Sequence, residues 1–214
     1  MKGLILKDLY AIKSFSKQYG MVLAFMLIWS VFMKDSSFIY VFSIMMGAMV
    51  IFSVISLDEA VSFNGFALTM PVSIKTLIKE KYLLFIITIS IGTVFSLFVN
   101  FIMILLPLQS FEGFHLREIM PVLSLFVVGI SAAFPIILKK GVEKGRYVYI
   151  AAMLGIGAVI YIGAKICINY EISLDAMENM PGILYGGIFA VICIGSLAIS
   201  YLVSVKLTKN KQWQ

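Results

Sequence analysis

Long apolar runs separated by short polar segments form the pattern of this chain. A helix needs about 20 apolar residues to cross a hydrocarbon core about 30 Å thick, and most of the runs are close to that length. They predict six transmembrane helices, at residues 19–33, 38–57, 82–106, 119–138, 147–168 and 183–205. We therefore expect an all-α integral membrane protein in which residues 1–214 form a single transmembrane domain.

The first 18 residues carry a different pattern, with apolar and basic residues on opposite sides of a predicted helix. The apolar face holds Leu4, Ile5, Ile12, Phe15 and Tyr19, and the other face holds Lys2, Lys13 and Lys17. This is typical of an amphipathic helix lying in the membrane interface. Asp8 falls among the apolar residues, where a desolvated carboxylate is costly. We expect it either to reach water or pair with a nearby lysine, or to contact another subunit.

The composition supports a membrane protein and argues against other classes. Hydrophobic residues make up 61% and charged residues 13% of the chain, whereas soluble domains have about 25% charged residues. The net charge of +6 comes mostly from basic residues beside apolar runs, which favours membrane lipid headgroups over nucleic acid as partners. Cys167 and Cys193 both lie inside apolar runs, so we expect neither a disulfide nor a metal site.

The distribution of basic residues predicts the orientation of the chain. Of the 17 Lys and Arg residues, 14 lie in segments 1–18, 58–81, 139–146 and 206–214, which alternate with the segments on the other side of the six spans. Lys and Arg accumulate in cytoplasmic segments of membrane proteins. We therefore expect both termini to be cytoplasmic.

Catalytic motifs are missing from the sequence. Without a Gly-Lys dipeptide there is no P-loop, a single histidine excludes H-E-x-x-H, and there is no G-x-S-x-G elbow. The predicted spans also lack the paired carboxylates that an intramembrane enzyme would use. We expect a protein that is not an enzyme.

Two polar residues within the predicted spans are candidates for a transport pathway. Asn100 lies in the third span and Lys165 in the fifth. Ionisable groups in membranes are often functional, although Lys165 is close enough to the interface for its side chain to reach water. We expect these residues either to line a pathway or, for Lys165, to extend to the membrane surface.

Small residues four positions apart predict close helix packing. The pairs are Gly129 with Ala133, Ala151 with Gly155, and Gly182 with Gly186. The fifth span is densest in small residues, so we expect it to form an interface with another span or with another subunit.

The segment 58–81, DEAVSFNGFALTMPVSIKTLIKEK, lies between the second and third spans. We expect Asp58 to cap a short helix that ends at Gly65, Met70-Pro71 to break the chain, and Ser73 to cap the next helix. Phe63, Phe66, Leu68 and Met70 are apolar residues in a cytosolic loop. Such residues either press a helix into the groove of a partner or fold back on the membrane surface.

Three stretches of the sequence resemble the membrane subunits of type II ABC exporters, in particular the small six-span permeases of the phenol-soluble-modulin exporter group. They are Leu6-Lys7-Asp8-Leu9-Tyr10, the pair Asp58-Glu59, and Leu68-Thr69-Met70-Pro71-Val72-Ser73 leading through Lys75 and Lys79 to Lys81-Tyr82. The resemblance implies that segment 58–81 is a coupling loop that docks on a separate ABC ATPase subunit. The coupling residues would be Asp58, Glu59, Phe63 or Phe66, Met70, Pro71 and Lys75, with a second contact at Lys140 and Glu143.

The resemblance also implies the partners and location of the protein. It indicates two permease subunits, identical or homologous, and two ATPases in the bacterial cytoplasmic membrane, exporting amphipathic peptides or other membrane-active compounds. ATP and Mg would be bound by the ATPase partner, so we expect no cofactor in this chain. The alternative is a membrane interaction protein that does not transport, such as a sensor or a toxin-immunity factor.

Overall fold

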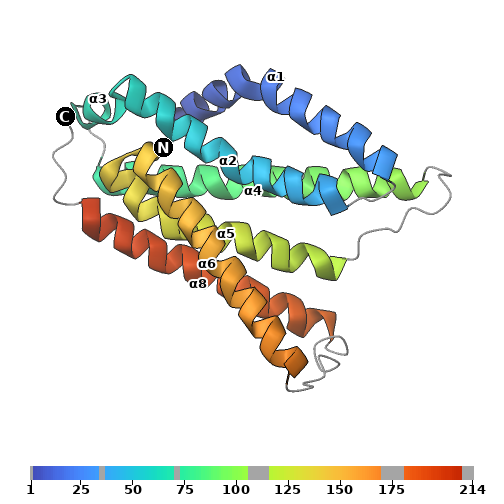
Figure 1. The fold of residues 1–214 in the computed structure, drawn as a ribbon. Helices are drawn as coiled ribbons and strands as arrows, with labels where there is room; N and C mark the ends of the chain where they lie inside the picture. Colours follow the sequence, from blue (N-terminus) through green and yellow to red (C-terminus); the bar gives the residue numbers. More distant parts are fainter. Residues whose placement is uncertain (1, 34–36, 70–72, 106–115, 170–180, 209–214) are drawn as a thin grey trace.

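The computed structural model describes residues 2–33, 37–69, 73–105, 116–169 and 181–208, and all regular structure in these ranges is helical. Figure 1 shows the arrangement of the helices. In chain order they are α1 (Lys2–Met33), α2 (Ser37–Ala60), α3 (Phe63–Thr69), α4 (Ile74–Leu105), α5 (Leu116–Lys140), α6 (Val142–Asn169) and α8 (Gly182–Thr208). The expectation of an all-α membrane fold is confirmed.

Six of these helices are long and apolar enough to cross a membrane: α1, α2, α4, α5, α6 and α8. Several extend beyond the predicted spans, as α4 does by starting at Ile74 rather than at residue 82. Helical hydrogen bonding continues beyond the apolar run, because water does not prevent a helix from extending past the membrane. The predicted interfacial segment 1–18 and the first span share one unbroken helix, α1.

The core of the molecule lies between two pairs of adjacent helices, α2 with α4 and α5 with α8. Its buried side chains include Tyr40 and Phe52 of α2, Phe85 of α4 and Phe134 of α5. The backbones of α2 and α4 approach closely at Gly47, because a Cβ atom there would lie 2.7 Å from the carbonyl oxygen of Thr88. Small residues at such crossings allow membrane helices to gain dispersion contacts along their length.

The helices α5 and α6 are joined by the single residue Gly141, whose φ of +96° favours glycine. Its N–H donates to the carbonyl oxygen of Ile137 at 2.9 Å and so ends α5. The predicted close packing at Gly129 and Ala133 is confirmed, since Ala133 is buried and the space beside Gly129 is filled by Met153 and Tyr149 of α6.

The other two small-residue pairs do not pack within the described part of the chain. No atom lies within 4 Å of the position that a Cβ atom would take at Gly155, Gly182 or Gly186. Ala151 and Gly155 of α6 are therefore exposed and available to lipid or to another subunit, whereas Gly145 of the same helix packs against Ile137 of α5.

One end of the bundle gathers segments that are far apart in the sequence (Figure 1). The short helix α3, the ends of α2 and α8, the starts of α1 and α4, and the junction of α5 with α6 all lie there. These segments contain most of the basic residues whose distribution predicted the orientation. The candidate site lies at this end.

Candidate functional site

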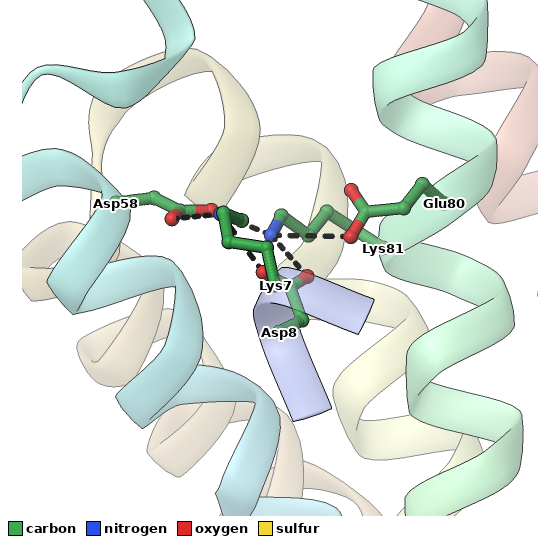
Figure 2. Close-up of polar contacts among 5 residues, drawn as sticks. All are labelled: Lys7, Asp8, Asp58, Glu80 and Lys81. Atoms are coloured by element: carbon green, nitrogen blue, oxygen red, sulfur yellow. Dashed lines mark hydrogen bonds and ion pairs between the residues drawn. The ribbon is translucent and has the colours of Figure 1, made fainter. Parts of the chain in front are cut away.

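A cluster of five ionisable side chains, called the charge cluster below, ties α1, α2 and α4 together at this end of the bundle. Figure 2 shows Lys7 and Asp8 of α1, Asp58 of α2, and Glu80 and Lys81 of α4 pointing toward one another. The Lys81 Nζ donates to Asp8 Oδ2 and to Asp58 Oδ2, each at 2.6 Å. The Lys7 Nζ donates to Asp58 Oδ1 and lies 2.8 Å from Asp8 Oδ1. Two ammonium groups therefore bridge two carboxylates supplied by different helices.

Four of the five residues in this charge cluster are almost inaccessible to solvent. The exposed fractions are 0% for Asp8, 1% for Glu80, 4% for Lys81 and 5% for Asp58. Moving charges out of water costs several kcal/mol per ion, so burial is tolerated only where each charge finds a partner. Glu80 lies 3.6 Å from Lys81 Nζ through its Oε1, and its carboxyl group also interacts with Asp8.

The pairing of Asp8 agrees with one of the alternatives drawn from the sequence. Asp8 pairs with its neighbour Lys7 and with Lys81, which is 73 residues away. It does not reach water. The start of α1 is therefore held to α4 by a buried ion pair.

Lys7 connects the charge cluster to the short helix α3. Its Nζ lies 3.7 Å from the centroid of the Phe63 ring, within the range of a cation–π interaction. The ring of Phe63 in turn lies 6.4 Å from that of Phe66. The first turns of α1 therefore help to place α3.

Two local predictions for this segment are wrong. Asp58 does not cap a short helix, because α2 continues to Ala60 and the Asp58 carboxylate pairs with Lys7 and Lys81. Gly65 does not end that helix, since it lies inside α3. The chain turns instead at Ser62, with φ of +49°. The prediction for Ser73 is confirmed, because its hydroxyl accepts a hydrogen bond from the Thr76 N–H at 3.2 Å.

Glu59 reaches from the end of α2 to the start of α6. Its carboxylate oxygens accept a hydrogen bond from the Val142 N–H, at 3.1 and 3.0 Å. A negative charge at this position is favourable, because the first N–H groups of a helix have no partner within it and carry a partial positive charge. The structure thus joins the two segments predicted as contacts, 58–81 and 139–146.

Tyr82, the residue after Lys81, fixes the start of α4 to the opposite side of the bundle. Its hydroxyl bonds with Ser200 at 2.6 Å and Ser204 at 2.8 Å, both on α8. Its ring stacks on Phe134 of α5 with 4.4 Å between centroids. Consecutive residues of α4 therefore bind α1 and α2 on one side and α5 and α8 on the other.

The remaining predicted coupling residues fall into two groups. Lys75, Lys140, Glu143 and Phe66 have exposed side chains, and Phe66 is 58% exposed. Met70 and Pro71 lie outside the described residues. Phe66 is consequently the predicted aromatic anchor that is open to a partner, whereas Phe63 is half-buried beneath Lys7.

The two candidate pathway residues have different environments. Asn100 is buried in α4, where it is 9% exposed. Lys165 is exposed on α6. They therefore do not share one buried environment.

Sequence reasoning did not predict that Lys7, Asp8, Asp58 and Lys81 meet. One signal was available, because each residue lies at the same predicted end of a span, where charged residues from successive helices become neighbours. The sequence does not show which of these residues pair, because separations of 51, 73 and 23 residues follow no helical periodicity.

Within the described ranges, no three His, Cys, Asp or Glu side chains are arranged to hold a metal ion. In those same ranges the cysteines are free thiols, with Cys193 buried and Cys167 half-buried. The chemistry that this end of the molecule offers is ionic linkage between helices and an exposed aromatic side chain on a short helix.

Comparison with known protein families gives a match that covers nearly the whole chain. The sequence model of a family described as "ABC-2 family transporter protein" matches residues 3–209. Neither a curated protein nor a solved structure matches the chain significantly.

Proposed function

The chain belongs to the ABC-2 family of transporter proteins, and we propose that it couples ATP hydrolysis by a separate ABC ATPase subunit to export across the membrane. As the multi-pass permease component, it does not itself carry the ATPase activity. The ATPase would contact α3 and the junction of α5 with α6.

The observation that carries this proposal is the exposure of Phe66 on a short helix that is anchored to the bundle. An aromatic side chain that is 58% exposed outside the long apolar helices is a suitable anchor for a groove on a partner. The anchoring of α3 through Phe63, Lys7 and the charge cluster would transmit force from the partner to α1, α2 and α4.

A second contact is proposed at the junction of α5 with α6. Lys140 ends α5 and Glu143 lies in the first turn of α6, and both side chains are exposed. The hydrogen bonds of Glu59 to Val142 keep this junction beside the end of α2. Both contacts would therefore move as one surface.

The proposed substrates are amphipathic peptides or other membrane-active compounds. The faces that the long helices expose are mostly apolar, and Lys165 is a charged exception on α6. A pathway of this kind would desolvate highly charged solutes at great cost. The exposed small residues of α6 support an interface with a second permease subunit, because their backbone allows close approach.

The experiment that tests this function is co-purification of the chain with the ABC ATPase encoded nearest to its gene, followed by reconstitution in lipid vesicles. We expect a stable complex whose ATP turnover rises with added amphipathic peptides and not with hydrophilic sugars. A chain that purifies without an ATPase would favour the interaction protein that does not transport. Stimulation by sugars or inorganic ions alone would contradict the proposed substrate class.

The proposed orientation is testable by labelling single cysteines in intact cells, with Cys167 and Cys193 first replaced by alanine. We expect an impermeant thiol reagent to label Ser37→Cys and Asn179→Cys from outside and to leave Ser73→Cys unlabelled until the cells are opened. The physical reason is the concentration of Lys and Arg at the end that carries Ser73. Labelling of Ser73→Cys from outside would reverse the orientation and remove α3 from the cytoplasm.

A further inference from the structure

An apolar groove of about 310 Å³ lies between α1, α2 and α4. Gly47 and Thr88 form part of its floor, and Leu9, Leu23 and Phe95 line its sides. Its polar groups are mostly engaged elsewhere: the Ser16 and Thr88 hydroxyls donate to carbonyl oxygens of their own helices, and Tyr19 bonds with Ser53. The groove therefore offers an apolar molecule almost nothing but apolar surface.

The position of the groove determines which kind of molecule can fill it. It is formed by three helices that are apolar enough to cross a membrane, and two of its lining residues, Leu9 and Ile91, are 41% and 60% exposed. In a bilayer the surrounding medium is lipid, and an empty apolar groove would forfeit dispersion contacts along its walls. The acyl chains of the bilayer are the nearest molecules that match this surface.

The dimensions distinguish an acyl chain from a helical peptide. From Leu9 to Leu23 the groove follows α1 for about 21 Å, at a rise of 1.5 Å per residue. One leaflet of the hydrocarbon core is about 15 Å thick, so the groove is long enough for the chain of a single lipid. A helix about 10 Å across occupies on the order of 1,600 Å³ over the same length, more than the whole empty space of about 900 Å³ in and beside the groove. The groove cannot enclose an amphipathic helix and suits one extended chain.

Charge at the rim indicates where the headgroup would lie. Lys13 and Lys17 are exposed on α1, each one residue after the groove-lining residues Ile12 and Ser16. Lysines close to the membrane surface attract the phosphate of anionic lipids. Side chains on a helix point toward its N-terminus, so both ammonium groups extend toward the Leu9 end of the groove, where Asp8 of the buried charge cluster precedes Leu9.

We propose that the groove between α1, α2 and α4 binds one acyl chain of an anionic phospholipid, whose phosphate is held by Lys13 and Lys17. The bound chain completes the packing of α1, which contacts the rest of the bundle mainly through α2. The assignment of the lipid to the cytoplasmic leaflet rests on the orientation proposed above. The binding of lipid in the groove does not depend on that orientation.

The test uses the full-length chain in nanodiscs containing phosphatidylglycerol with a photoreactive group on its acyl chain, without any ATPase. We expect crosslinks to concentrate on the groove-lining parts of α1, α2 and α4 and to be largely lost in Gly20→Leu. Gly20 lines the groove, and no atom lies within 4 Å of its Cβ position, so the leucine fills space without a clash. The matched control is Gly187→Leu on α8, which also adds a leucine where no atom lies within 4 Å but is not among the groove-lining residues. We expect it to leave the crosslinks unchanged.

The headgroup contact is tested separately by Lys13→Gln and Lys17→Gln. At low salt we expect each substitution to reduce crosslinking by phosphatidylglycerol about fivefold relative to phosphatidylcholine, the effect of one lysine near a charged surface. As a control, the double substitution Lys139→Gln with Lys140→Gln should leave the crosslinking by phosphatidylglycerol relative to phosphatidylcholine unchanged. Four outcomes would each overturn the proposal. Two concern the labelling: uniform labelling of all exposed helices, or unchanged labelling in a stably folded Gly20→Leu. The others are displacement of the lipid by an amphipathic peptide and crosslinks between two copies of the chain. None of these outcomes would alter the test of ATPase binding.

Discussion

Replacement of Lys81 by methionine is expected to destabilise the protein by about 3–5 kcal/mol, the effect of removing one partner from a buried ion pair. The side chain is 4% exposed and donates to both Asp8 and Asp58, so its loss leaves two buried carboxylates that share only Lys7. Methionine keeps the apolar stem and removes the charge, which separates electrostatics from packing. The measurement is the free energy of unfolding by denaturant in detergent micelles.

The matched control for this experiment is Lys79→Met, because Lys79 lies on the same turn of α4 and is exposed. Surface substitutions of this kind usually change stability by no more than about 0.5 kcal/mol. In a background of Asp8→Asn and Asp58→Asn, Lys81→Met should be much less harmful, since fewer buried charges are then left unpaired. If Lys81→Met unfolds at the same denaturant concentration as Lys79→Met, the charge cluster does not stabilise the joining of α1, α2 and α4.

Replacement of Phe66 by alanine is expected to weaken binding of the ATPase about 30-fold, which corresponds to about 2 kcal/mol for one aromatic hot spot. The ring is 58% exposed in the isolated chain, so its removal should cost little folding stability while removing the anchor proposed for the partner. The measurement is the dissociation constant of the ATPase for the permease held in nanodiscs. The thermal stability of the free variant is measured in parallel.

The matched control is Phe98→Ala, because Phe98 of α4 is 59% exposed and lies toward the other end of the bundle. Phe63→Ala makes a second comparison. It removes the ring beneath Lys7, so we expect a loss of stability in α3 as well as weaker binding. Equal affinities for wild type, Phe66→Ala and Phe98→Ala would remove α3 from the proposed ATPase contact.

The two sets of experiments separate anchoring from docking. Lys81→Met acts on the charge cluster, which would weaken ATPase binding only through the position of α3. Phe66→Ala acts on the docking residue itself. A variant that unfolds more easily and binds less tightly is thus distinguishable from one that binds less tightly at unchanged stability.

The sequence by itself determined the class of the protein and the locations of its helices. Six apolar runs of membrane length are decisive because a helix in lipid must satisfy its backbone internally and present apolar side chains over its whole length. The helix cap at Ser73 was also predictable from the sequence, since a capping residue and the N–H group that it binds are only a few residues apart. The exposure of an aromatic residue in segment 58–81 followed from the position of Phe66 outside the apolar runs.

Only the tertiary structure decided which residues form the site. Asp58 was expected to cap a local helix, yet α2 continues to Ala60 and the carboxylate pairs with Lys7 and Lys81 of other helices. Glu59 binds Val142, 83 residues away, and the lipid-facing groove exists only where three helices meet. The physical reason is that hydrophobic periodicity and caps are local, whereas the partner of a buried charge is whichever opposite charge the packing of whole helices brings within reach.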